Sequence, residues 1–196
     1  MCNEVRRTVA LGKIREDFSF TRIPLRFPEA LPNLAPLESI RITDPTAIIR
    51  AAADERGAAE MVVRRWSWPG PGGKPVYNFR SEGREFKAGR CLIVVDGFYE
   101  FTAPADPKAK RKHKWLFTRA GEDWFCIAGL WRLDPKVGEA FTILTTAPGP
   151  DVAPYHDRQV AVLDRADWAG WLDPEVPAAE LLRPLAPGTL KVEQIA

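Results

Sequence analysis

Proline and glycine recur along the whole chain, and together they limit every regular element to a short segment. The 196 residues include 18 prolines and 14 glycines. Because proline removes a backbone N–H donor and glycine favours turns, the chain cannot form a bundle of long helices. We expect many short strands and helices joined by turns, within one domain that has a sizeable core.

Composition narrows the class of protein further. Hydrophobic residues make up 45% of the chain and charged residues 28%, which excludes disorder as the main state. The net charge of +2 is too small to indicate a nucleic-acid partner by itself. The distribution of charge is more informative, because basic residues cluster at 64–65, 80–90 and 108–114.

Cysteine and histidine are too few for the usual metal and disulfide frameworks. The three cysteines show no CxxC spacing, and the chain has two histidines, so we expect no disulfide framework, no metal and no cofactor. The N-terminus carries no apolar signal segment, and no run approaches about eighteen apolar residues. We therefore expect a cytoplasmic protein with no membrane partner.

Apolar patterns predict where the regular elements lie. The most hydrophobic run, Arg90–Val95, predicts a central buried strand. Apolar positions between Arg7 and Phe18 mix spacings of three and four residues, which predicts a short amphipathic helix that would anchor the N-terminus. Further strands are expected at 39–42, 46–51, 61–66, 115–118, 124–131, 140–146 and 189–195, and helices at 168–172 and 178–182.

Two tryptophans open a segment that is rich in proline and glycine. Trp66 and Trp68 precede a run, 69–73, that is not expected to form secondary structure. Such a loop would display both indoles beside Arg64 and Arg65, an arrangement suited to base stacking and phosphate contact on single-stranded nucleic acid. The alternative is that both indoles belong to the core.

Polar residues in three other segments are candidates for chemistry. Asn78 offers both a donor and an acceptor, and Arg80 can bind a phosphate or a carboxylate, although this cluster could equally cap a helix. Glu100 follows the central strand between aromatic residues, where partial burial would raise its pKa toward the range useful for proton transfer. The alternative is a surface charge on an alternating strand.

His156 lies in a Pro-rich loop between two apolar runs. A single histidine is more often a packing residue than a catalyst, but here Asp157 can orient the imidazole and Arg158 can hold an anionic substrate. The sequence therefore predicts a polar site to which this loop contributes.

Cys2 would carry two nucleophiles if Met1 were removed, as it normally is before a small residue. A free α-amine titrates near ~8 and a thiol near ~8.5. Together they can capture an aldehyde first as an imine and then as a five-membered thiazolidine. The alternative is that Cys2 is idle on a frayed terminus.

The order of these motifs resembles that of the SRAP family, the SOS-response-associated peptidases or abasic-site processing proteins. The matching segments are Cys2, Asn78-Phe79-Arg80-Ser81-Glu82, Asp96-Gly97-Phe98-Tyr99-Glu100 and His156-Asp157-Arg158. The resemblance implies an α+β fold: a single domain over residues 1–196 with a strongly bent, barrel-like, mostly antiparallel sheet and a few short helices. It also implies a positively charged channel for single-stranded DNA that contains abasic sites. Nothing in the sequence demands more than a monomer.

The resemblance also implies roles for individual residues. Cys2 matches the crosslinking nucleophile, Asn78 the residue that positions it, and Glu100 the acid/base carboxylate. His156 matches the histidine that helps to open the deoxyribose ring or to reverse the adduct. The expected DNA contacts are Arg80, Arg158, Trp66, Trp68, Arg64 and Arg65.

Three functions fit these features. The first is covalent capture of abasic sites in the DNA damage (SOS) response, with weak lyase activity by β-elimination as a side reaction. The second is an N-terminal-nucleophile cysteine peptidase with autoproteolytic activity, and the third is a non-catalytic module that binds single-stranded nucleic acid. One departure from the family pattern is that Asn3-Glu4 replaces the usual Gly-Arg and puts a negative charge beside Cys2.

Overall fold

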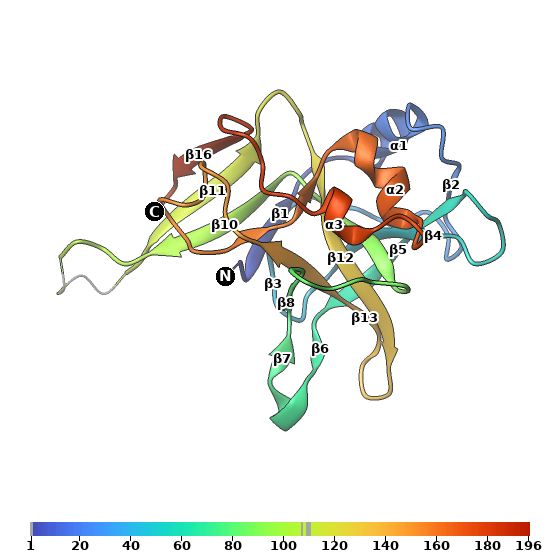
Figure 1. Ribbon diagram of the computed structural model, residues 1–196, viewed down its shortest axis with the longest axis horizontal. Helices are drawn as coiled ribbons and strands as arrows, with labels where there is room; N and C mark the ends of the chain where they lie inside the picture. The colour runs from blue at the N-terminus through green and yellow to red at the C-terminus, as the bar shows by residue number, and fades with distance from the viewer. Residues whose placement is uncertain (1, 107, 109–110) are drawn as a thin grey trace.

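The computed structural model describes residues 2–106, 108 and 111–196, and strands make up most of its regular structure (Figure 1). Met1 and part of the basic cluster at 108–114 lie outside the described residues. Among the described residues, no helix is long and apolar enough to cross a membrane. The elements are β1 Glu4–Arg7, α1 Leu11–Ser19, β2 Leu25–Arg26, β3 Leu37–Arg41, β4 Pro45–Ala51, β5 Ala59–Trp66, β6 Trp68–Pro69, η1 Pro71–Gly73, β7 Pro75–Val76, β8 Asn78–Arg80, β9 Arg90–Val95, β10 Gly97–Thr102, β11 His113–Arg119, β12 Phe125–Asp134, β13 Gly138–Thr146, β14 Gln159–Val160, β15 Val162–Leu163, η2 Arg165–Asp167, α2 Trp168–Leu172, α3 Ala178–Leu181 and β16 Leu190–Gln194.

Five strands close into a ring at the centre of the fold. β13 pairs with β12, β12 with β9, β9 with β4 and β4 with β5, all antiparallel. A parallel pair between β5 and β13 closes the ring, with Arg65 opposite Ala140 and Trp66 opposite Phe141. The expected α+β fold with a bent, barrel-like and mostly antiparallel sheet is confirmed.

Alternation along the ring strands divides the apolar residues between two cores. In β9, Cys91, Ile93 and Val95 belong to one core, and Leu92 and Val94 belong to the other. Both cores include side chains from all five ring strands, and the first, to which no helix contributes, fills the inside of the ring. The second includes the apolar side chains of α1, α2 and α3, so the helices cover the outside. In Figure 1 the three helices lie away from β10, β11 and β16.

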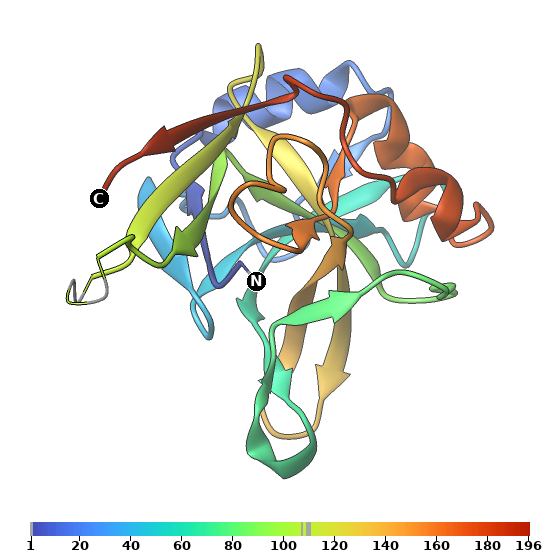
Figure 2. The same cartoon turned by 60° about the vertical axis from the view of Figure 1, so that its left-hand side comes forward.

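A second sheet holds the N-terminal segment. Its order is β16-β11-β10-β1-β3, and all of its pairs are antiparallel. β1 therefore lies between β3 and β10, and Val5 stands opposite Ile40 on one side and Phe98 on the other. This position brings the residues before β1 close to the middle of the molecule (Figure 2).

The structure corrects what precedes the first helix. The predicted helix from Arg7 begins only at Leu11, and a strand occupies Glu4–Arg7. The buried carboxylate of Asp96 fixes the end of this strand: Oδ1 accepts from Arg6 Nε at 2.6 Å, and Oδ2 accepts from the Val9 backbone N–H at 3.0 Å. Both the backbone N–H and the hydroxyl of Thr8 donate to the same carboxylate. Cys2 is thus anchored by a strand rather than by a helix.

The segment after Trp66 is more regular than its composition suggested. The run 69–73 was expected to lack secondary structure, yet Trp68–Pro69 pairs with Pro75–Val76 as a two-stranded sheet. The turn between them uses Gly72 and Gly73 in the left-handed region, with φ of 68° and 76°, which favours glycine. The geometry of this turn, rather than an apolar pattern in the sequence, determines that the hairpin forms.

Candidate functional site

Four segments that are far apart in the sequence come together around the start of β1. Cys2 precedes β1, Asn78 begins β8, Glu100 lies in β10, and His156 lies in the loop between β13 and β14. In Figure 2 the loop that carries His156 (orange), β8 (green) and β10 (yellow-green) surround the blue start of β1. The four residues that the sequence singled out for chemistry are therefore brought to one place.

Cys2 is held by one hydrogen bond from its side chain and one to its backbone carbonyl oxygen. Its side chain is buried, with 1% of the residue exposed, and Sγ donates to the carbonyl oxygen of Glu4 at 3.3 Å. The side-chain amide of Asn78 donates to the Cys2 carbonyl oxygen at 2.7 Å. Burial, reinforced by the negative charge of Glu100, raises the pKa of the Cys2 thiol well above its usual range. The sulfur therefore keeps its proton at neutral pH.

Asn78 owes its position to the ring. β8 pairs in parallel with β13, and this pairing sets Asn78 opposite Ile143. Since Asn78 stands at a fixed register beside the ring strand β13, its amide reaches Cys2 without a flexible loop between them. The alternative that this cluster caps a helix is wrong, because Asn78 begins a strand.

Glu100 is a buried carboxyl group, with 2% of the residue exposed. Burial, together with the negative charge of Asp157, raises the pKa of Glu100 to about 7. A carboxyl group with this pKa is present in both protonation states near neutral pH, so it can donate a proton and accept one. The alternative of a surface charge is wrong.

His156 faces Glu100 across 4.0 Å, measured from Nε2 to Oε2. Its Nδ1 accepts a hydrogen bond from the backbone N–H of Arg158 at 2.9 Å. Burial lowers the pKa of His156, although Asp157, whose Oδ1 lies 2.9 Å from Nδ1, acts in the opposite direction. The imidazole is thus neutral at pH 7 and can both give and take a proton.

The negative charge that follows Cys2 has its own counter-ion. Glu4 is buried, with 4% exposed, and its carboxylate binds Lys114 Nζ at 2.7 Å. The same ammonium group lies 3.9 Å from the centre of the Tyr99 ring. Glu4 therefore does not present an uncompensated negative charge beside Cys2.

The four expected arginine contacts differ in what already binds them. Arg158 forms a bidentate pair with Glu82 and also donates to the Thr145 carbonyl oxygen at 2.8 Å. Arg80 is exposed at the end of β8, on the same short strand as Asn78.

The other two arginines lie where β5 joins β13. Arg64 pairs with Glu29 and Glu139, and Arg65 donates to the Thr43 carbonyl oxygen at 3.4 Å. Arg64 is therefore part of an ion-pair network at the ring closure.

The expectation that Trp66 and Trp68 are displayed for base stacking is wrong, and the core alternative holds. Trp66 ends β5 at the closure of the ring, where it is 0% exposed, stacks on Phe141 and donates from Nε1 to the Tyr77 carbonyl oxygen at 2.9 Å. Trp68 is 7% exposed, and the guanidinium group of Arg132 lies 4.4 Å from its ring centre. Neither ring face is open to a base.

Two aromatic residues that the sequence motifs do not mark also reach the site. Trp115 lies in β11 directly opposite Glu100, and its ring contacts Tyr155, the residue before His156. Both aromatic residues are half-buried. The apolar pattern predicted a strand at 115–118, but it carried no signal for which residue of β10 faces Trp115.

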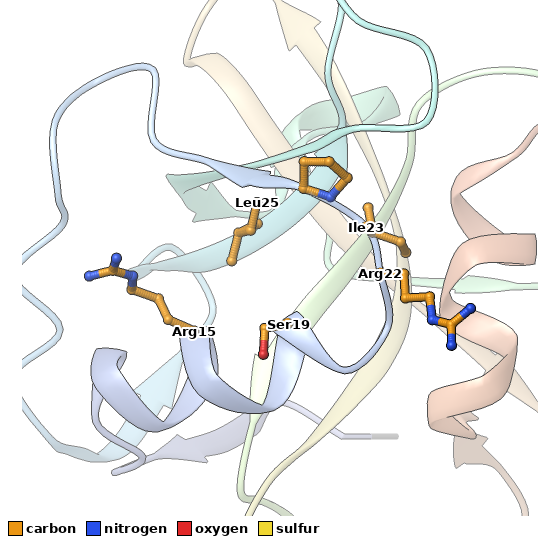
Figure 3. A pocket seen from close by; sticks show the side chains of 6 residues that line it. Arg15, Ser19, Arg22, Ile23 and Leu25 are labelled. Atoms are coloured by element: carbon orange, nitrogen blue, oxygen red, sulfur yellow. The ribbon is translucent and has the colours of Figure 1, made fainter.

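The part of the chain that the structure describes holds no group of three or more His, Cys, Asp or Glu residues arranged to bind a metal ion. A pocket of about 390 Å³ lies between α1 and β2 (Figure 3). None of the residues around the start of β1 lines it, and it contains no pair of acid/base groups. The residues lining it are Arg15, Ser19, Arg22, Ile23, Pro24 and Leu25.

Comparisons with known proteins show which family the chain belongs to. The family model described as SOS response associated peptidase (SRAP) matches residues 1–196. A curated relative, the abasic site processing protein HMCES of Gallus gallus, is 30% identical in an alignment that covers 54% of this chain and 38% of the relative. The aligned region thus spans less than half the length of that relative.

Solved structures share the fold at low sequence identity. A protein from Bordetella bronchiseptica has a TM-score of 0.70 and 23% identity, with both chains covered completely. A protein from Bacteroides thetaiotaomicron has a TM-score of 0.75 and 17% identity, over 100% of this chain and 92% of that one. A phage-related protein from Bordetella bronchiseptica has a TM-score of 0.75 and 21% identity, over 99% and 94%.

Proposed function

Because the chain belongs to the SOS response associated peptidase (SRAP) family, we propose that it captures abasic sites in single-stranded DNA as a covalent adduct on Cys2. The observation that carries this proposal is the convergence of Cys2, Asn78, Glu100 and His156 around the start of β1. The printed name of the curated relative, an abasic site processing protein, supports the same substrate.

Ring opening is the first chemical task. An abasic deoxyribose is mostly a closed hemiacetal, so the proton of the C1′ hydroxyl must be removed and a proton delivered to the ring oxygen before an aldehyde appears. Glu100 has a pKa of about 7, and Nε2 of His156 lies 4.0 Å from its carboxyl oxygen Oε2. These two groups can supply and accept the protons near neutral pH.

Capture then takes two steps. The α-amine of Cys2, freed by removal of Met1, adds to the C1′ carbonyl, and loss of one water gives an imine. The sulfur next attacks the imine carbon, and its proton passes to the nitrogen, which closes a thiazolidine. Burial keeps the proton on the resting thiol, so that proton must leave the sulfur as the attack occurs, because the thiolate is the nucleophilic form. The bond from Asn78 to the Cys2 carbonyl oxygen fixes the backbone during both steps.

Failure of the second step would produce a side reaction. An imine acidifies the C2′ proton, so removal of that proton leads to β-elimination and strand cleavage. We therefore assign the chain a weak lyase activity that increases when the sulfur is absent but the amine remains, as in Cys2→Ser.

DNA binding rests on cations near the site. Arg80 is exposed on the same strand as Asn78, and Arg158 follows His156 by two residues. Phosphate contacts of this kind weaken as salt rises, so binding should fall with ionic strength while the chemistry of an already formed adduct does not change.

A denaturing gel tests the proposal. The protein, Cys2→Ala and the matched control Cys126→Ala are each incubated with single-stranded DNA that holds one abasic site. Cys126 is buried in the outer core and should leave the adduct unchanged. We expect the unmodified protein and Cys126→Ala to form an adduct that survives denaturation, and Cys2→Ala to form none. No adduct from the unmodified protein, or an adduct from Cys2→Ala, would refute the assignment of Cys2.

A further inference from the structure

The face of the second sheet that carries Glu100 continues outward as an aromatic surface. In register, Phe98 stands opposite Phe117, Glu100 opposite Trp115 and Thr102 opposite His113. The first pair is buried in the core, and the last lies at the loop end of the hairpin. Trp115 is thus the first aromatic residue that a molecule bound at Glu100 would meet on its way out of the site.

Contacts on several sides hold the Trp115 ring in one orientation. Its Nε1 donates to Thr102 Oγ1 at 2.8 Å, its centre lies 4.6 Å from that of Tyr155 at an interplanar angle of 58°, and His113 meets it edge-on at 6.4 Å. His113 is itself fixed, since its Nδ1 lies 3.0 Å from Gln194 Nε2. The Trp115 ring is half-buried, so part of a pre-oriented aromatic ring is open to solvent.

Charge near this ring favours an anionic partner. Arg111 and Lys112 directly precede His113 and are exposed. Trp131, the other half-buried tryptophan of the described chain, instead has the guanidinium group of Arg50 over its ring at 4.0 Å. Only Trp115 thus combines a half-buried ring, exposed cations next to it in the chain and a place beside Glu100.

We propose that Trp115, with Tyr155 and His113 behind it, is a subsite for the base of the nucleotide next to the abasic position. This inference rests on the proposed function, which places the abasic sugar at Glu100. The base stacks on the indole, and the adjoining phosphate lies within reach of Arg111 and Lys112. Aromatic residues bind single-stranded bases in this way without demanding a sequence. The subsite supplies the stacking that the buried Trp66 and Trp68 cannot provide.

Tryptophan fluorescence tests the subsite without any covalent chemistry. The probe is oligothymidylate, which has no abasic site and cannot form an adduct. Trp66, Trp124, Trp168 and Trp171 are 0% exposed and Trp68 is 7% exposed, so contact quenching by a base should report on Trp115. We expect quenching in the unmodified protein and in Trp131→Phe, and its loss in Trp115→Phe. Absence of quenching in the unmodified protein, or its persistence in Trp115→Phe, would overturn the proposal.

Affinity separates stacking from a structural role. Removing a stacking aromatic side chain typically weakens binding by about 5- to 150-fold. Trp115→Leu should lose affinity for oligothymidylate in that range, whereas Trp115→Phe, which keeps a flat ring, should lose much less. Equal losses in the two variants would contradict stacking.

The rate of adduct formation provides a second test of the subsite. Two substrates are compared, one with normal nucleotides beside the abasic site and one in which both neighbours are tetrahydrofuran spacers that lack a base. The unmodified protein should form its adduct more slowly with the spacers, and Trp115→Leu should show little difference between the two. If no protein forms an adduct yet quenching behaves as expected, the capture chemistry fails and the subsite stands. If adducts form with no preference for a neighbouring base, the subsite is refuted and the capture chemistry stands.

Discussion

Replacing Glu100 by Gln should stabilise the protein at alkaline pH and change little at acidic pH. Burial raises the pKa of this carboxyl group from 4.5 to about 7 in the folded chain, while the unfolded chain exposes it to water. The folded state therefore binds one more proton than the unfolded state between about pH 4.5 and pH 7. The neutral carboxyl group makes its full contribution to stability below the pKa that it has in the unfolded chain. This contribution is lost as the pH rises through the pKa that the group has in the folded chain.

The size of the stability change follows from the difference between the pKa values of Glu100 in the unfolded and folded chains. At 1.36 kcal/mol for each pKa unit, the difference between 4.5 and about 7 corresponds to about 3 kcal/mol of stability lost above pH 7. Solvent screening does not reduce this figure much, because only 3% of the Glu100 side chain is exposed. Glutamine imitates the protonated carboxyl group in size and cannot ionise, so Glu100→Gln should escape the loss.

Urea denaturation at several pH values measures the effect. The free energy of unfolding of Glu100→Gln minus that of the unmodified protein should rise from a low plateau near pH 4.5 to a plateau about 3 kcal/mol higher above pH 7.5. Other titrating groups cancel in this difference. Glu193→Gln, which removes an exposed carboxylate from β16, corrects for the change in net charge. A difference that does not vary with pH, or that falls as the pH rises, would refute the raised pKa of Glu100.

Other substitutions test how the N-terminal strand and the ring are held. Asp96→Asn weakens the charged hydrogen bonds that fix the end of β1, so it should cost about 2 to 3 kcal/mol of stability and speed amide hydrogen exchange in β1 more than in β12. Lys114→Met leaves Glu4 buried without its counter-ion and should lower the free energy of unfolding, measured with urea, by about 3 kcal/mol. Adding Glu4→Gln to this variant should restore most of the loss. Equal stability of the single and double variants would contradict this. Gly129→Ala would place Cβ 2.8 Å from the Thr142 carbonyl oxygen and should lower the melting temperature by several degrees, since the cost of such overpacking is about 1 to 3 kcal/mol.

Local patterns predicted most of the ring strands. The apolar runs 90–95 and 140–146 are strands in the structure, because each has enough hydrophobic residues to be buried on both faces and ends at a turn. The strand Glu4–Arg7 escaped prediction because three of its four residues are charged. It exists only because β3 and β10 pair with it and Asp96 binds its end, and these contacts are distant in sequence.

The site was predictable in its members but not in its geometry. The order of motifs identified Cys2, Asn78, Glu100 and His156, and the structure brings them together. The burial of Trp66 could not be read from its sequence neighbours, because it follows from the parallel pairing of β5 with β13. Contacts between distant strands decide such features, and a single sequence does not reveal their register.

Peptide mapping of the adduct locates the residue that captures the DNA. The protein is incubated with a short single-stranded DNA that holds one abasic site, digested with protease and nuclease, and measured by mass spectrometry. We expect the DNA remnant on the N-terminal peptide that begins at Cys2, with Met1 absent and with the mass of the two partners less one water. A variant that retains Met1 should form no adduct. A remnant on any other residue, or an adduct on a chain that retains Met1, would contradict capture by the amine and thiol of Cys2.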